Sequence, residues 1–191
     1  MDQHSEQEVA VHRVSEIIGK PTVSAETGDR LGKVADALLA DGGINVVAIV
    51  LGGGLLGKER VLPFHDIQTL GGDTVLARTE SGIREPLEWR RAGVKATRSS
   101  ALRGKPVVTV GGQRVGEVSD LLVNDETGKF AGVEVETRHL GGFRTKRAIL
   151  RASDDMRIGP DAVIVGDGAL DQVDGPEHRH VARSARRQQG T

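Results

Sequence analysis

A nine-residue pattern occurs twice in the chain, and this duplication constrains the fold more than any other feature of the sequence. Residues 31–39 (LGKVADALL) and residues 115–123 (VGEVSDLLV) share Gly, Val, Asp and Leu at matched positions. Upstream, the tripeptide GKP occurs at residues 19–21 and again at residues 104–106. The interval between the copies is far longer than the roughly 20–50 residues of a solenoid repeat. The pattern therefore predicts two tandem copies of one domain.

The length of the chain, 191 residues, accommodates two small domains. A copy of about 65 residues builds a core of only marginal stability, so we expect the two domains to pack against each other. The predicted organisation is a disordered lead-in (1–12), a first domain (13–78), a linker (79–100), a second domain (101–166) and a disordered tail with a basic end (167–191).

Within each copy, short apolar segments alternate with turns rich in Gly, Asn and Asp. In the first copy the predicted strands are residues 21–24, 31–39, 44–51, 58–64 and 73–77, with a short helical turn at 66–70. In the second copy they are residues 106–110, 115–123, 130–137, 148–150 and 162–165. Short strands and turns at this spacing are typical of a small antiparallel barrel.

A family resemblance rests on the repeated segments. They are residues 18–21, 28–36 and 60–67 in the first copy, and 103–106, 115–120 and 148–150 in the second. These segments resemble the PRC-barrel family, whose small β-barrel occurs in the photosynthetic reaction-centre H subunit and in ribosome-maturation factors. The resemblance implies an all-β protein made of two tandem small antiparallel β-barrels, with short helical turns and polar termini. It also implies a protein-interaction module, because members of the family mostly act in that way.

Composition excludes several functional classes. The net charge is −1, so nothing attracts the whole chain to nucleic acid or to an acidic membrane. The chain has no cysteine, which excludes disulfides, thiol catalysis and cysteine-based metal sites. The longest apolar run, residues 46–51, is far too short to span a membrane, and the polar, acidic start is unlike a signal peptide. We therefore expect a soluble cytoplasmic protein.

The glycine-rich segment 52–57 (GGGLLG) fits the dinucleotide-binding pattern GxGxxG, and Asp73 follows at a suitable distance. Pyrophosphate binding by this pattern needs a helix that begins at the glycines. The residues that follow read as a strand instead. A related phosphate-binding pattern also fails, because Glu59 replaces the Ser or Thr that would hold magnesium. The segment therefore predicts a β-turn and no bound nucleotide.

Asp36 and Asp120 occupy equivalent positions in the two copies. Strict alternation along a strand would place Asp36 on the face of Val34 and Leu38. A carboxylate on an apolar face needs hydrogen-bond donors. One interpretation is a proton-relay group, and the other, which we favour, is a structural carboxylate that accepts backbone amides at a bend in the strand.

No pattern of catalytic or metal-ligating residues is recognisable. The six histidines lack the i, i+4 spacing of a helical metal site, and no nucleophile motif occurs. Few aromatic residues are present to stack on RNA bases, so the sequence disfavours RNA binding. The basic end of the tail, with Arg183, Arg186 and Arg187, suits either contact with phosphates or an acidic partner, or a solvated end, which we favour. We expect no enzyme activity, cofactor or metal.

One strand of the first copy is apolar on both faces. We align its inward residues with those of the second copy: Val47, Ile49 and Leu51 with Ala131, Val133 and Val135. The other face carries Val46, Ala48 and Val50, whereas the second copy has Glu134 in place of Val50. A strand that is apolar on both faces is usually covered on both. We expect the other barrel, the linker around Trp89 or a second subunit to cover this face.

The sequence thus favours a non-enzymatic scaffold or adaptor that binds a protein partner, docked at the cytoplasmic face of a membrane complex. A homodimer through the doubly apolar strand of the first domain is one form of partner. Two alternatives stay open: an RNA-processing or ribosome-associated maturation factor, and an accessory protein that resembles the reaction-centre H subunit.

Overall fold

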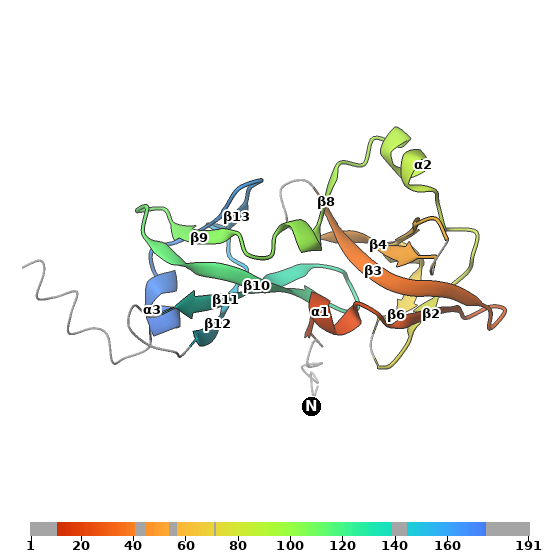
Figure 1. The fold of residues 1–191 in the computed structure, drawn as a ribbon, viewed down its shortest axis with the longest axis horizontal. Helices are drawn as coiled ribbons and strands as arrows, with labels where there is room; N and C mark the ends of the chain where they lie inside the picture. Colours follow the sequence, from red (N-terminus) through yellow and green to blue (C-terminus); the bar gives the residue numbers. More distant parts are fainter. Residues whose placement is uncertain (1–10, 41–44, 54–56, 71, 139–144, 175–191) are drawn as a thin grey trace, which may run out of the picture.

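The computed structural model describes residues 11–40, 45–53, 57–70, 72–138 and 145–174. The strands form two seven-stranded sheets that lie side by side (Figure 1). The first has the order β5-β4-β3-β2-β7-β6, with β8 added on β3, and the second has the order β12-β11-β10-β9-β14-β13, with β1 added on β10.

The first sheet contains β2 (Pro21–Ser24), β3 (Arg30–Ala40), β4 (Val46–Gly52), β5 (Arg60–Pro63), β6 (Ile67–Thr69), β7 (Val75–Ala77) and β8 (Ala96–Arg98). The second contains β1 (Val11–Arg13), β9 (Pro106–Thr109), β10 (Arg114–Asn124), β11 (Phe130–Arg138), β12 (Thr145–Arg151), β13 (Arg157–Ile158) and β14 (Val163–Val165). The helical elements are α1 (Val14–Ile17), η1 (Phe64–Asp66), α2 (Pro86–Arg91), η2 (Ser99–Ala101) and α3 (Ala169–Asp174).

Each repeat contains the same hairpin, β2–β3 in the first and β9–β10 in the second. We call residues 11–77 repeat 1 and residues 96–165 repeat 2. The turn between β2 and β3 has Gly28 at φ 79°, and the turn between β9 and β10 has Gly112 at φ 81°. Positive φ is easily reached only by glycine, which explains why both tight turns contain one. The long strands β3 and β10, which carry the duplicated nine-residue pattern, then extend across their sheets.

The sheets differ from the antiparallel barrels expected from the sequence. β2 pairs with β7 in parallel, and β9 pairs with β14 in parallel. The reason is that the last strands of each repeat arrive over a long connection, which permits parallel pairing, whereas the short turns of the sequence indicate only antiparallel neighbours. Within the described residues the strand pairing leaves each sheet open rather than closed into a cylinder. The fold is mostly β, in two open sheets of mixed pairing.

The two repeats exchange their first strands. β1, at the start of repeat 1, pairs with β10 of repeat 2, and β8, at the start of repeat 2, pairs with β3 of repeat 1. A bridge between Asn45 and Lys129 joins the repeats again, and the Val46 amide donates to the Gly128 carbonyl at 2.8 Å. One hydrophobic cluster contains buried residues of both repeats. The two repeats therefore share one core.

Several segments expected to be irregular are ordered. Residues 11–12, assigned to a disordered lead-in, belong to β1, because their backbone pairs with β10. Residues 169–174, assigned to a disordered tail, form α3, in which Ala169 and Val173 are buried against the core. The linker 79–100 contains α2 and β8. The expected helical turn at 66–70 lies earlier, at η1, and β6 follows it. Tertiary contacts stabilise these short segments, which are too short to be stable alone.

β-Bulges change which residues of the central strands face the core. Leu38 pairs with Ala48 but Leu39 pairs with Val46, so one extra residue of β4 is inserted at Val47. The inward face is therefore Val46, Ile49 and Leu51, and the assignment of Val47 to that face was wrong. The same bulge occurs in repeat 2, where Phe130 rather than Ala131 enters the core. Each bulge shifts the alternation by one residue.

Candidate functional site

A second pair of bulges reorients the aspartates that occupy equivalent positions in the two repeats, Asp36 and Asp120. Val34 pairs with Leu51, and Asp36 pairs with Val50, so the pairing register shifts between them. Val34 enters the core, while Asp36 faces the opposite side of the sheet together with Leu38. The expectation that Asp36 shares a face with Val34 was therefore wrong, because strict alternation ends at the bulge.

Asp36 binds the start of the other repeat. Its side chain is buried, and it accepts hydrogen bonds from the Ser99 hydroxyl at 2.5 Å, the Ser100 hydroxyl at 2.5 Å and the Ser100 amide at 3.2 Å. It also accepts the amide of Ala37 at 2.8 Å, and a guanidinium nitrogen of Arg98 lies 3.9 Å away. The carboxylate thus holds η2 and the end of β8 on the sheet of repeat 1.

Asp120 performs the reciprocal contact. It accepts the amide of Ser15, at the start of repeat 1, at 3.2 Å, and the amide of Leu121 at 2.8 Å. Arg103 donates to the same carboxylate oxygen at 3.4 Å. Each aspartate therefore accepts backbone amides at a bend and ties its own repeat to the first segment of the other. This geometry supports a structural role, with hydrogen-bond donors surrounding each carboxylate.

The apolar outer face of β4 is covered by the chain itself. Ala48 and Val50 are buried in a small cluster with Leu38 and Val61. Trp89, on α2, packs against this cluster from the linker. Figure 1 shows α2 projecting above β4. Of the three covers expected for this face, the linker around Trp89 therefore lies over Ala48 and Val50. These side chains cannot also form a homodimer surface, because they are already buried within the chain.

Repeat 2 carries a charged residue, Glu134, at the position equivalent to Val50. Glu134 pairs with Asp120 across β10 and β11, as Val50 pairs with Asp36 in repeat 1. The Arg13 guanidinium donates to Glu134 at 2.5 Å, and Arg147 lies 3.5 Å from its other oxygen. The hydrogen bond to Glu134, followed by one to Glu16, raises the pKa of Arg13 above its ordinary value. The two outer faces are therefore chemically different: apolar and helix-covered in repeat 1, ion-paired in repeat 2.

A groove lies beside Trp89. It consists of two hollows of about 440 and 580 Å³ that share the side chains of His65, Trp89 and Val94. The larger hollow also borders Glu126 and Thr127, in the turn between β10 and β11 of repeat 2. The remaining lining is Pro63, Asp66, Arg84, Glu88 and Ala92 in the first hollow, and Val46, Val47, Phe64, Ile67 and Arg78 in the second. The groove therefore combines an apolar interior with charged rims, and both repeats contribute to it.

The polar groups of this groove have unused capacity. The Trp89 indole nitrogen Nε1 is buried, and it has no hydrogen-bond acceptor among the described residues. The His65 side chain is 80% exposed, and its Nε2 lies 3.5 Å from a carboxylate oxygen of Asp66. Buried polar groups are normally paired. A guest in the groove would meet the exposed His65 side chain and the side chain of Trp89, whereas the buried indole N–H becomes available to an acceptor only if neighbouring side chains move.

The sequence pointed to part of this groove and missed the rest. Trp89 and Val46 were candidate interface residues, and both line it. His65, Arg84 and Arg78 were not singled out, because they are separated along the chain and no local spacing relates them. Ser99 and Ser100, the donors to Asp36, were also missed. Their position at the start of the second repeat, equivalent to that of Val14 and Ser15, is the signal that could have found them.

The remaining candidates carry no site in the described residues. Residues 57–59 are irregular and β5 begins at Arg60, so no helix follows the described glycines as dinucleotide binding requires. Within the described ranges, no cluster of three or more His, Asp or Glu residues could hold a metal ion. Arg183, Arg186 and Arg187 lie outside the described residues. None of the helices in the described part of the chain has the length and apolar character that crossing a membrane requires.

The comparisons with known proteins identify a family for both repeats. The model of the PRC-barrel domain matches residues 10–82 and again residues 96–172. These two segments contain both exchanged strands and both sheets. A comparison with curated proteins found no match. The family resemblance of the repeated sequence segments is thereby confirmed, in two copies, and the chain belongs to the PRC-barrel domain family.

Proposed function

We propose that this chain is a non-enzymatic protein-interaction module that binds a protein partner in the groove beside Trp89. The observation that carries the proposal is the groove itself, in which Trp89 and Val94 border both hollows and charged side chains border each of them. Membership of the PRC-barrel family supports an interaction or accessory role of this general kind.

The chemistry of the groove suits a protein segment. Tryptophan and arginine are enriched among the residues that contribute most to protein interfaces. Here Trp89 lies between the apolar interior and a rim that carries Arg84 and Glu88 on one side. Arg78 and Glu126 lie on the other side. A peptide that inserts an apolar side chain beside Trp89, and that carries charged side chains of both signs, would fill the interior and match charges at the rim.

The groove also has the position expected of an adaptor site. Repeat 1, the linker and repeat 2 all contribute side chains to the larger hollow. A partner seated there would contact the parts of the chain that pack the two repeats together. Binding would therefore depend on the assembled pair of repeats rather than on one repeat alone. We place the protein in the cytoplasm, at a membrane complex, as part of the same proposal.

The test compares two matched arginine substitutions. Val94→Arg places a charged side chain in both hollows. Leu87→Arg makes the same kind of change on α2, at a side chain that is 58% exposed and does not line the groove. Wild type and both variants are used as bait in native lysate, at low and high salt, and circular dichroism verifies their folding. We expect one protein partner to be retained by wild type and Leu87→Arg and lost with Val94→Arg.

A second readout uses the fact that Trp89 is the only tryptophan. When the captured partner, or a tryptophan-free peptide from it, is added back, the fluorescence emission of Trp89 should shift and saturate. A partner that Val94→Arg retains as well as wild type would refute the groove as the site. Recovery of RNA or ribosomal proteins that dissociate at high salt would instead favour a ribosome-associated role.

A further inference from the structure

A third hollow, of about 540 Å³, lies on repeat 1 where β3 begins, β4 ends and β5 begins. Three cationic side chains line it: Arg30, Lys33 and Arg60. Arg30 and Lys33 are exposed, whereas Arg60 is half-buried and one of its guanidinium nitrogens donates to the carbonyl of Leu31. This site is separate from the groove beside Trp89, since the two share no lining residue.

The positive charge of this hollow is uncompensated. Among the residues that the structure describes, no acidic side chain lines it. In the described part of the chain none of the three cationic groups forms an ion pair within 4.0 Å. Like charges brought together in one concave surface repel each other and concentrate a positive potential there. An anionic ligand would remove this repulsion.

The floor of the hollow is backbone and small apolar side chains. Gly32 has φ 144°, and a Cβ atom built on it would lie 2.9 Å from the Gly52 carbonyl oxygen. A side chain at this position is therefore excluded, and the floor stays open. Ile18, Leu31 and Ala35 supply an apolar wall. The site combines a cationic rim with an apolar interior, within the size range of small-molecule pockets.

Repeat 2 provides an internal comparison. Strand pairing matches Lys33 and Gly52 with Glu117 and Glu136. It likewise matches Arg60 with Ala148, since the two pair with the equivalent residues Leu51 and Val135.

The charge at the equivalent place in repeat 2 is already neutralised. Arg114 follows the β9–β10 turn there as Arg30 follows the β2–β3 turn, and it forms an ion pair with Glu117 at 2.6 Å. The same backbone therefore carries three cationic side chains around a hollow in repeat 1, and an Arg–Glu ion pair at the equivalent place in repeat 2. The cationic hollow is not a consequence of the fold alone.

We infer that the hollow of repeat 1 binds a small organic phosphate. Three cations match a phosphomonoester, which carries up to two negative charges near neutral pH, better than they match a single carboxylate. Arginine recognises phosphate oxygens through paired hydrogen bonds, and lysine contributes a point charge. The apolar wall accommodates the organic group. This mode differs from nucleotide binding by GxGxxG, because side chains supply the charge and no helix terminus takes part.

The test uses phenyl phosphate as the probe, with the full chain and amide chemical shifts measured by NMR. We expect saturable shifts at the amides of Gly19, Gly32 and Gly53, with a dissociation constant of about 1 mM or below. Inorganic phosphate should bind at the same amides about tenfold more weakly, because it lacks the apolar group. Equal affinity for inorganic phosphate would overturn the organic part of the inference.

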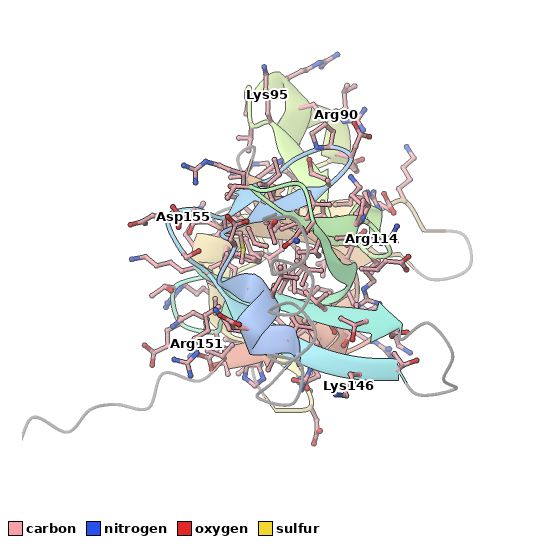
Figure 2. The ribbon with its side chains drawn as sticks, turned by 90° about the vertical axis from the view of Figure 1, so that its left-hand side faces the viewer. Arg90, Lys95, Arg114, Lys146, Arg151 and Asp155 are labelled. Atoms are coloured by element: carbon pink, nitrogen blue, oxygen red, sulfur yellow. The ribbon has the colours of Figure 1, made fainter. Side chains whose placement is uncertain are left out.

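Two variants install the residues of repeat 2. Lys33→Glu changes an exposed side chain, and Gly52→Glu adds a Cβ whose nearest contact, 3.6 Å from the Cβ of Ala35, is ordinary. Both should weaken binding at least about tenfold. Lys146→Glu is the matched control, since Figure 2 shows Lys146 at the periphery of repeat 2.

The control variant should leave the affinity unchanged. Equal weakening by Lys146→Glu would show a bulk charge effect and overturn the site. Chemical-shift changes that do not saturate by about 10 mM phenyl phosphate, or that occur at amides outside the hollow, would also overturn the proposed site.

Discussion

Replacing Asp36 by alanine should destabilise the protein more than any other single carboxylate truncation in the described residues. Asp36 is 3% exposed, and it accepts four hydrogen bonds. Two of the donors are backbone amides, those of Ala37 and Ser100, which cannot turn toward water. The other two are the hydroxyls of Ser99 and Ser100, which can reorient. The cost of Asp36→Ala therefore comes mainly from two buried amides left without an acceptor and from the loss of hydrogen bonds to a charged group.

The magnitude follows from the number of bonds. A hydrogen bond to a charged group contributes about 1.5–3 kcal/mol, and a buried donor left without an acceptor costs about 1–3 kcal/mol. Because the serine hydroxyls recover part of their bonding, we expect Asp36→Ala to lower the free energy of unfolding by about 3–5 kcal/mol. Asp36→Asn keeps one acceptor oxygen and should cost about 1–2 kcal/mol. It remains measurable if the alanine variant fails to fold.

The matched control is Asp120→Ala. Within the described residues, Asp120 accepts the amides of Ser15 and Leu121 and a longer bond from Arg103, whose side chain is 43% exposed. Ion pairs with such exposed partners contribute little. We therefore expect a cost about 1–2 kcal/mol smaller than that of Asp36→Ala.

The assay is urea unfolding followed by the fluorescence of the single tryptophan and by circular dichroism. A double-mutant cycle with Ser100→Ala should show a coupling energy of about 1 kcal/mol or more. If Asp36→Ala costs less than about 1 kcal/mol, or no more than Asp120→Ala, then Asp36 does not hold the two repeats together as described here.

Three further predictions concern stability. Val50→Glu buries a second carboxylate under α2, beside that of Asp36. The free energy of unfolding measured in urea should therefore fall by more than about 3 kcal/mol, and an unchanged value would contradict the burial of this face of β4. Gly32→Ala should lower the free energy of unfolding by about 1–3 kcal/mol and Tm accordingly, because φ at this position is 144° and the added Cβ would lie against the Gly52 carbonyl. The control variant Gly52→Ala should leave Tm nearly unchanged. Burial raises the pKa of Glu16, but hydrogen bonds from Arg13 outweigh it and hold that pKa below its ordinary value. The contribution of Glu16 is thus present above the unfolded pKa and lost as pH falls through the folded pKa, so Glu16→Gln should lower Tm slightly at pH 7 and leave it unchanged near pH 3.

The repeat and its strands were readable from the sequence because their causes are local. The duplicated pattern in 31–39 and 115–123 became β3 and β10, and Gly28 and Gly112, in the hairpin turns that precede them, have positive φ. Hairpin turns and period-two alternation depend on neighbours in the chain, so sequence spacing records them. The strand 46–51, apolar on both faces, was also recognisable from the sequence as a strand that must be buried on both faces.

Inward and outward assignments failed where bulges intervene. One extra residue at Val47 moved Val46 into the core, and the register shift after Val34 placed Asp36 on the outer face. A bulge is decided by pairing with the opposite strand, and nothing in the spacing of one strand announces it. The faces of a strand are therefore predictable only up to its first bulge.

The sequence by itself determined the duplication, the main strands of each repeat with the hairpin turns between them, and the presence of an apolar face that needed a cover. Only the tertiary structure decided that the repeats exchange β1 and β8, that Asp36 and Asp120 bind the opposite repeat, and that α2 covers β4 beside a groove. It also decided that the cations around the hollow of repeat 1 stay without an ion pair in the described residues, while Arg114 of repeat 2 pairs with Glu117. The physical reason is range: turns and alternation arise between neighbouring residues, whereas strand exchange, ion pairing and covering join residues far apart in the chain, whose meeting depends on the free energy of the whole fold.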